Sequence, residues 1–236
     1  MTPILCNRRT IVSAAFFYTS KVHMRSKIIG VGIISGLIAL LFVGSNTEVS
    51  DGLLQVHFLD VGQGDATFIE GPDGTQILID GGPDTSVLQE LRDIMGFFDR
   101  DIDLVVATHS DRDHIGGLIE VLERYDIGTL LLTQNENDTP VSELFLERVN
   151  EEGAEVMFAK AAQTLIFDDA ALKILFPDRD VTGLESNTSS IIAQLIYGDT
   201  EFLFTGDSPQ AIEKYLVELY GTELESDVLK VGHHGS

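Results

Sequence analysis

The chain has little cysteine: Cys6 is the only one among its 236 residues. A single cysteine can build neither a disulfide framework nor a cysteine-rich zinc site, so domains stabilised in either of these ways are excluded. The same scarcity is compatible with either side of a membrane. The length allows one domain with a sizeable core, or two small ones.

Basic residues are also scarce, and they are unevenly placed. Lys+Arg 15 stand against Asp+Glu 38, a formal net charge of −23. Residues 1–47 contain five of the bases and no acid, so residues 48–236 hold 38 acids against 10 bases, or −28. A field of that sign repels polyanions unless metal ions or a local basic patch offset it. The alternative is a surface adapted to solubility or to salt.

One long apolar run is present, "KIIGVGIISGLIALLFVG" at residues 27–44. It follows a basic flank, residues 1–27, and its length lies at the lower edge for a membrane-spanning helix. Positive charge before the run and acids after it predict an inside N-terminus and an extracytoplasmic main domain. We expect residues 28–44 to be a membrane anchor, with a cleaved export signal or a buried helix as alternatives, and residues 45–52 to be a linker. Met24 is an alternative start.

From residue 53 onward the chain alternates between short strands and amphipathic helices. Apolar runs bounded by turn residues predict strands at 53–61, 66–71, 75–82, 101–109, 127–133, 155–158, 164–168, 171–176, 190–197, 200–205 and 227–232. Apolar residues at helical spacing predict helices at 85–97, 114–125, 140–151 and 209–220. Strands that cluster, alternate with helices and cluster again predict one α/β domain, residues 53–236, built as an αββα sandwich.

Polar residues directly follow four of the predicted strands. They are Asp80, the stretch 109–114, Asp207 and the pair 233–234. Strand ends are where α/β layers place reactive groups, because the strand is rigid and the loop after it is exposed. These four positions are therefore the candidates for a functional site.

The densest of them is "ATHSDRDHIGG", residues 107–117. In an extended turn, residues i, i+2 and i+4 can converge on one cation while residue i+5 faces a second. His109, Asp111, Asp113 and His114 have this spacing, and imidazole and carboxylate both suit first-row divalent metals. The alternative is a turn that caps the following helix, with Asp113 as the N-cap.

"THSDRDHIGG" resembles the HxHxDH signature of the metallo-β-lactamase superfamily, with Asp111 in place of the second histidine. Three other stretches resemble further motifs of that superfamily: "LIDGG" (78–82), "FTGD" (204–207) and "HHGS" (233–236). "FLDVGQGDATFI" (58–69) is similar to the soluble domain of the ComEC-like branch, which contains DNA-uptake channels. The resemblance covers residues 53–236 and implies the four-layer fold of the superfamily.

The resemblance implies a centre of two divalent ions, Zn²⁺ or Mn²⁺. The first ion would be held by His109 and Asp111, the second by Asp113, His114 and His233, and Asp207 would bridge the two. Asp80 would order the ligand loop through hydrogen bonds. Two ions about 3.5–4 Å apart can hold a hydroxide nucleophile and neutralise charge on a phosphoryl or acyl oxygen.

The chain departs from the superfamily pattern in three places. A histidine that many members supply is replaced by "ESNTSSI" (185–191), in which Asn187 and Ser190 either contact substrate or water or are plain turn residues. Asp111 makes the first ion site richer in oxygen, which shifts its preference from Zn²⁺ toward harder ions such as Mn²⁺. The sequence stops at Ser236, where ComEC-like domains continue, so we expect an incomplete C-terminal layer.

Three further residues are weaker candidates. Asp65, in "DVGQGD" (60–65), either faces the cleft or belongs to a tight glycine turn. His234 either replaces His233 as a ligand or donates a proton to the leaving group. His57 is expected at the surface of a strand.

These observations favour a membrane-anchored or exported metal-dependent hydrolase that cleaves phosphodiesters, with Asp113 orienting the nucleophile. The resemblance suggests single-stranded DNA as substrate, although a charge of −28 argues against strong unaided DNA binding. A basic groove formed by Lys173, Arg179 or Lys230 would support DNA. The alternatives are a hydrolase of small esters, lactones or phosphonates and a non-catalytic, metal-stabilised module, which six intact ligand positions disfavour. No protein partner is identifiable from the sequence.

Overall fold

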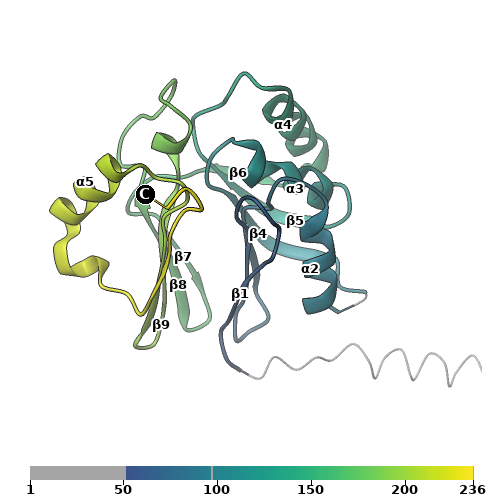
Figure 1. Cartoon of the computed structure of the whole chain (residues 1–236). Helices are drawn as coiled ribbons and strands as arrows, with labels where there is room; N and C mark the ends of the chain where they lie inside the picture. Colours follow the sequence, from purple (N-terminus) through teal and green to yellow (C-terminus); the bar gives the residue numbers. More distant parts are fainter. Residues whose placement is uncertain (1–51, 97, 236) are drawn as a thin grey trace, which may run out of the picture. The chain divides into compact units, whose positions relative to one another are not determined.

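Two mixed β-sheets lie face to face in the computed structural model, which describes residues 52–96 and 98–235 (Figure 1). The first sheet has the order β1 (Gln55–Phe58), β2 (Thr67–Glu70), β3 (Gln76–Ile79), β4 (Asp101–Ala107), β5 (Asp126–Leu132), β6 (Glu155–Phe158). The second has the order β11 (Val228–Lys230), β10 (Thr200–Phe204), β9 (Ile192–Tyr197), β8 (Ala170–Phe176), β7 (Thr164–Phe167). All of these strands belong to one compact unit, Val49–Ser236.

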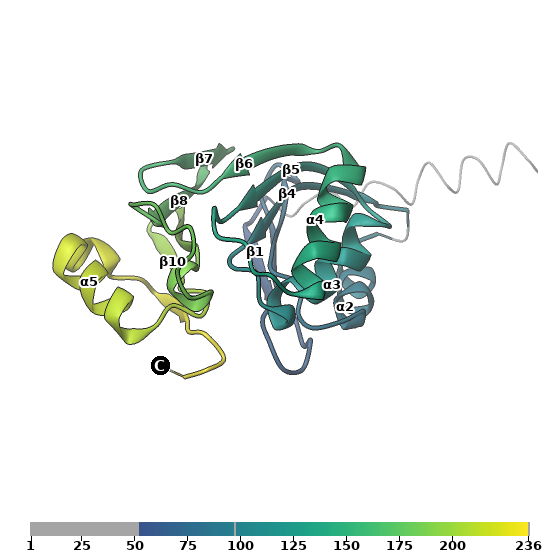
Figure 2. The same ribbon diagram turned by 90° about the horizontal axis from the view of Figure 1, so that it is seen from above.

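Helices cover the outer face of each sheet. They are α2 (Ser86–Ile94), α3 (Arg112–Leu122) and α4 (Pro140–Glu152) on the first sheet and α5 (Gln210–Tyr220) on the second. Two 3-10 turns complete the described elements: η1 (Asn187–Ser189) lies between β8 and β9, and η2 (Gly221–Leu224) follows α5. Seen from above, the layers follow one another as α5, second sheet, first sheet and the group of α2, α3 and α4 (Figure 2). This is an α/β sandwich with two mixed sheets.

Three apolar cores hold these layers together. One lies between the first sheet and helices α2 to α4, one between the two sheets, and one between the second sheet and α5. Strand β3 shows how the sequence fills two cores at once: Leu78 faces the helices, whereas Ile77 and Ile79 face the other sheet. A strand covered on both faces needs apolar residues at consecutive positions, which is why "QILI" lacks a polar alternation.

Helix α4 illustrates how local sequence fixes the element ends. The Thr139 hydroxyl accepts a hydrogen bond from the Ser142 backbone N–H, and Pro140 occupies the first turn. Gly153 ends the helix in the left-handed conformation that glycine adopts without strain. The predicted range 140–151 agrees with the observed Pro140–Glu152.

The other predicted helices and strands are also present, with boundary shifts of a few residues. The main correction concerns α3, predicted at 114–125, which begins at Arg112. Asp111 therefore occupies the N-cap position that the alternative interpretation gave to Asp113, and the Asp111 side chain makes no capping hydrogen bond.

The predicted membrane or signal segment, residues 28–44, lies outside the described residues. Within residues 52–96 and 98–235, none of the helices combines the length and apolarity needed to cross a bilayer. The membrane segment and the incomplete C-terminal layer stay predictions.

Candidate metal centre

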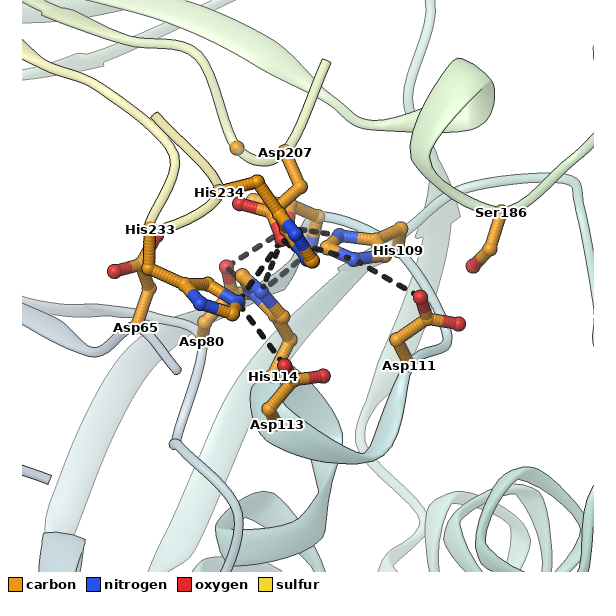
Figure 3. A network of polar contacts seen from close by, with 12 residues as sticks. Asp65, Asp80, His109, Asp111, Asp113, His114, Ser186, Asp207, His233 and His234 are labelled. Carbon is orange, nitrogen blue, oxygen red and sulfur yellow. Dashed lines mark hydrogen bonds and ion pairs between the residues drawn. The ribbon is translucent and has the colours of Figure 1, made fainter. Parts of the chain in front are cut away.

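The four predicted polar positions meet at one edge of the sandwich. Strands β3 and β4 are parallel neighbours in the first sheet, and β10 and β11 are parallel neighbours in the second. Residues that follow the carboxyl ends of parallel strands emerge at the same edge. Figure 3 shows that the side chains after these strands point toward one another: Asp80, those of the turn after β4 (residues 109–114), Asp207 and the pair 233–234.

Asp207 lies at the centre of this cluster and is buried, with 4 % of the residue's surface exposed. Its Oδ2 lies within 4.0 Å of the Nε2 atoms of four histidines: His109 (4.0 Å), His114 (3.2 Å), His233 (3.1 Å) and His234 (3.2 Å). Its Oδ1 is buried and has no hydrogen-bond partner in the part of the chain that the structure describes. One carboxylate thus faces all four imidazoles of the site.

Asp80 supports the cluster from behind. Its carboxylate accepts hydrogen bonds from the Thr108 backbone N–H and the Thr108 hydroxyl, both at 2.8 Å, and lies 2.8 Å from His114 Nδ1. Its backbone has a positive φ of 59°, a conformation that costs energy for a residue other than glycine. The contact orients His114 so that Nε2 faces Asp207, the arrangement in which a carboxylate commonly holds a metal-binding histidine.

Thr108 determines which nitrogen of His109 carries a proton. Because its hydroxyl donates to Asp80, its oxygen is left to accept from His109 Nδ1 at 3.0 Å. The Nε2 of His109 then presents a lone pair toward Asp111 Oδ2 (3.7 Å) and Asp207 Oδ2 (4.0 Å). That nitrogen is buried and lacks a hydrogen-bond partner among the described residues. A lone pair facing two carboxylates is repulsive unless a cation lies between them, so these residues fit a divalent ion.

The potential ligand atoms fall into two groups, each with all atoms within 4.8 Å of one another. One group is His109, His114 and Asp207, and the other is Asp113, His233 and His234. The resemblance assigned His114 to the second ion, whereas in the structure His114 lies in one group with His109. His234, assigned either a ligand or a donor role, stands in the second group although its side chain is 55 % exposed. Asp207 belongs to the first group, but its Oδ2 also lies 3.1 Å from His233 Nε2 and 3.2 Å from His234 Nε2, so the two adjacent groups fit two ions.

Asp111 and Asp113 lie on opposite sides of the turn after β4. The Asp113 Oδ2 atom is 3.0 Å from His233 Nε2, so Asp113 belongs to the second group. Asp111 flanks the first group, and Asn137 Nδ2 donates a hydrogen bond to its Oδ1 at 2.9 Å. Asn137 was not predicted from the sequence, because only the fold brings the loop before α4 to this turn.

Proximity of opposite charges perturbs the pKa values of the cluster. Burial disfavours the charged form of His114, but the carboxylates of Asp80 and Asp207 outweigh it and raise the pKa of His114 to about 10. Burial opposes ionisation of Asp207, yet the hydrogen bond from His114 and the neighbouring imidazoles lower its pKa to about 2. Burial, followed by the positive charge of His114, lowers the pKa of His109, which keeps that imidazole neutral.

The turn η1 borders the site with unpaired polar atoms. Ser190 Oγ and Asn187 Oδ1 are buried, and neither has a hydrogen-bond partner within residues 52–96 and 98–235. A Cβ atom on Gly206 would lie 3.0 Å from Ser190 Cβ, so Ser190 packs against the segment that carries Asp207.

The three basic residues considered for a DNA groove do not form one. Lys230 is paired with Asp65 at 2.5 Å, and Arg179 is paired with Asp178 and lies over the Tyr215 ring. Lys173 lies in the middle of β8, away from the carboxyl edge. Near His109 the structure has instead a cavity of about 430 Å³ with largely apolar walls, among them Phe145, Val149 and Phe158.

The comparison with known families identifies the class of protein to which the fold and site belong. The profile of the metallo-beta-lactamase superfamily matches residues 59–236, and the chain therefore belongs to that superfamily.

Within it the chain is related to competence proteins. It is 28% identical over 222 residues to ComE operon protein 3 of Bacillus subtilis (strain 168), which covers 87% of this chain and 28% of that protein. It is 30% identical over 194 residues to Recombination protein 2 of Haemophilus influenzae, covering 80% of this chain and 22% of that protein. The chain thus spans less than a third of the length of these relatives.

Solved structures show the same fold at low sequence identity. A metallo-beta-lactamase from Cronobacter sakazakii, a mutant of its HARLDQ motif, superposes with a TM-score of 0.52 at 13% identity, covering 75% of this chain and 77% of that one. MEM-A1, a subclass B3 metallo-beta-lactamase from a soil metagenome, gives a TM-score of 0.51 at 16% identity, covering 75% and 76%. At such identities the likeness concerns the fold alone.

Proposed function

We propose that the protein is a metal-dependent phosphodiesterase and that single-stranded DNA is its substrate class. The observation that carries the proposal is the bare, buried Nε2 of His109 facing Asp111 and Asp207, within a cluster of four imidazoles around one carboxylate. The resemblance to the ComEC-like branch, which contains DNA-uptake channels, supports DNA over other phosphodiesters.

Two divalent ions are proposed, the first near His109, His114, Asp207 and Asp111, the second near Asp113, His233 and His234. Divalent ions in such a centre supply Lewis-acid activation of water and neutralise charge on the phosphoryl group. Three carboxylates among these ligands favour Mn²⁺ over Zn²⁺, because hard oxygen donors suit the harder ion.

The remaining roles fall to side chains that border the ligands. Asp113 orients the nucleophile through the carboxylate oxygen that does not face His233. His234, half exposed at the mouth of the site, donates a proton to the leaving oxygen. The unpaired polar atoms of Asn187 and Ser190 support contacts with phosphate oxygens or with water.

The proposal extends to the location of the protein. Residues 28–44 anchor the chain in a membrane or direct its export, and the hydrolase domain lies on the extracytoplasmic side. The support is the charge asymmetry around the apolar run.

A second candidate function is hydrolysis of a small ester or lactone. The cavity of about 430 Å³ next to His109 favours it, because mostly apolar walls suit an uncharged ligand. The net negative charge of the domain also favours a small uncharged substrate, because it weakens binding of a polyanionic one.

A substrate and metal screen on the full chain separates the two functions. The substrates are single-stranded DNA, bis-p-nitrophenyl phosphate and a lactone, each with Mn²⁺ and with Zn²⁺. The proposal expects cleavage of both phosphodiesters, faster with Mn²⁺, and loss of that activity in Asp113→Asn. Cleavage of the lactone alone would establish the second candidate instead.

A further inference from the structure

The loop between β1 and β2, residues 60–65, contacts both segments that carry the second ligand group. Gln63 Nε2 lies 3.0 Å from Nδ1 of His233. Asp65 donates its backbone N–H to the Asp113 carbonyl at 3.3 Å, and its carboxylate pairs with Lys230 at 2.5 Å. The loop is therefore tied to the turn after β4 and to the end of β11.

The two glycines of "GQG" determine how this loop approaches the site. Gly64 has a φ of 118°, and a Cβ atom there would collide with the carbonyl group of Asp113. Gly62 also has a positive φ, 77°, but open space lies around it. Only glycine at position 64 lets the loop backbone lie against Asp113, and this approach brings Gln63 within reach of His233.

The contact between Gln63 and His233 has a consequence for metal binding. With the amide nitrogen of Gln63 facing Nδ1, that ring nitrogen accepts, so in the neutral ring the proton resides on Nε2, which lies 3.0 Å from Asp113 Oδ2 and has no hydrogen-bond partner among the described residues. A divalent ion at Nε2 requires the other tautomer, with the proton on Nδ1. That proton needs an acceptor, and Gln63, whose amide already contacts Nδ1, can offer its Oε1 after rotation of the amide.

We propose that Gln63 is the positioning residue of His233: its amide turns so that Oε1 accepts the Nδ1 proton whenever Nε2 binds a divalent ion. The proposal rests on the metal centre of the proposed function and deepens it. The Gln63 side chain is exposed, and its terminal torsion is a soft one, so rotation meets little resistance. Hydrogen bonds of this kind orient metal-binding histidines and raise their basicity.

The test compares three variants of the full chain by their affinities for two successive Zn²⁺ ions, measured by competition with a chromophoric chelator. Gln63→Met keeps the shape of the side chain but removes the acceptor, and we expect the weaker of the two affinities to fall about 10–100-fold. Gln63→Glu is an obligate acceptor, and we expect it to retain or exceed the wild-type affinity. Gln210→Ala, an exposed glutamine on α5, is the control and should change neither affinity.

If Gln63 had a purely structural role, Gln63→Met and Gln63→Glu would have similar Zn²⁺ affinities, because both keep the shape of the side chain. Equal affinities of Gln63→Met and wild type would overturn the proposal, as would a Gln63→Glu variant as weak as Gln63→Met. The readout is independent of catalysis. A chain that shows the expected affinities but cleaves no phosphodiester would refute the proposed function and leave this inference standing, whereas unchanged affinity in an active Gln63→Met chain would refute the inference alone.

Discussion

Thr108 is the residue on which the first ligand group depends, although it is not one of the proposed ligands. Its hydroxyl donates to Asp80 and accepts from His109, which leaves the His109 Nε2 lone pair facing the site. Thr108→Val removes both hydrogen bonds while keeping the volume nearly constant. We expect it to destabilise the protein by about 1–3 kcal/mol, because a buried carboxylate loses a partner, and to weaken the tighter Zn²⁺ affinity.

The matched control for this substitution is Thr164→Val, at an exposed position of β7. It should change the free energy of unfolding by less than about 0.5 kcal/mol. Denaturant unfolding and chelator competition measure the two effects. Equal behaviour of the two variants would mean that Thr108 does not set the proton positions of His109.

His114 couples metal binding to pH. Its pKa in the folded, metal-free protein is raised from 6.5 to about 10 by Asp80 and Asp207 against the effect of burial. The stability that this charge contributes is therefore fully present below pH 6.5 and is lost as the pH rises through about 10. A metal ion at Nε2 must displace the same proton, so its affinity increases over the same range.

We expect the melting temperature of the metal-free chain to fall between pH 7 and 10 while Zn²⁺ affinity rises. Titration calorimetry in buffers of different ionisation enthalpy should detect the proton released on binding at neutral pH. A binding enthalpy independent of the buffer would show that His114 is not protonated before the ion arrives.

At the scale of elements, the loop 60–65 contains two glycines, Gly62 and Gly64, whose replacement by alanine can be compared. Gly62→Ala and Gly64→Ala both force a positive φ on alanine, at a cost of about 1–2 kcal/mol. Only the second substitution also collides with the backbone of Asp113, which adds about 1–3 kcal/mol of overpacking. Thermal unfolding of the two variants measures the difference. Equal destabilisation would mean that the loop does not press against the turn after β4.

The sequence allowed the elements and the strand-end positions to be predicted because both follow from local patterns. Apolar runs identify buried strands, and a polar residue after such a run, as at Asp80 or Asp207, marks the carboxyl edge. The contact between Gln63 and His233 could not be predicted, since it joins residues 170 positions apart through side-chain directions that only the packed sheets define. The same applies to the grouping of His114 with His109.

At the scale of the whole molecule, the net charge of the domain opposes binding of the proposed substrate. Residues 48–236 carry a net charge of −28, yet the proposed substrate is a polyanion. Salt weakens binding when bases contact phosphates, but it screens repulsion when the surface is acidic. We expect the KM for single-stranded DNA to fall as ionic strength rises from about 0.02 to 0.15 M.

Bis-p-nitrophenyl phosphate, with a single charge, is the control substrate, and its KM should change much less over this range. A KM for single-stranded DNA that increases with salt would indicate a basic binding surface, contrary to the pairing of Lys230 with Asp65 and of Arg179 with Asp178.

We propose above that Asp207 and the four histidines around it form a binuclear metal centre. Elemental analysis of the full chain after equilibration with Mn²⁺ or Zn²⁺, beside an Asp207→Ala variant shown to be folded by circular dichroism, tests it most directly. We expect about two ions per wild-type chain and loss of at least one of them in the variant. A wild-type chain without bound metal, or a variant that retains the full complement, would contradict it.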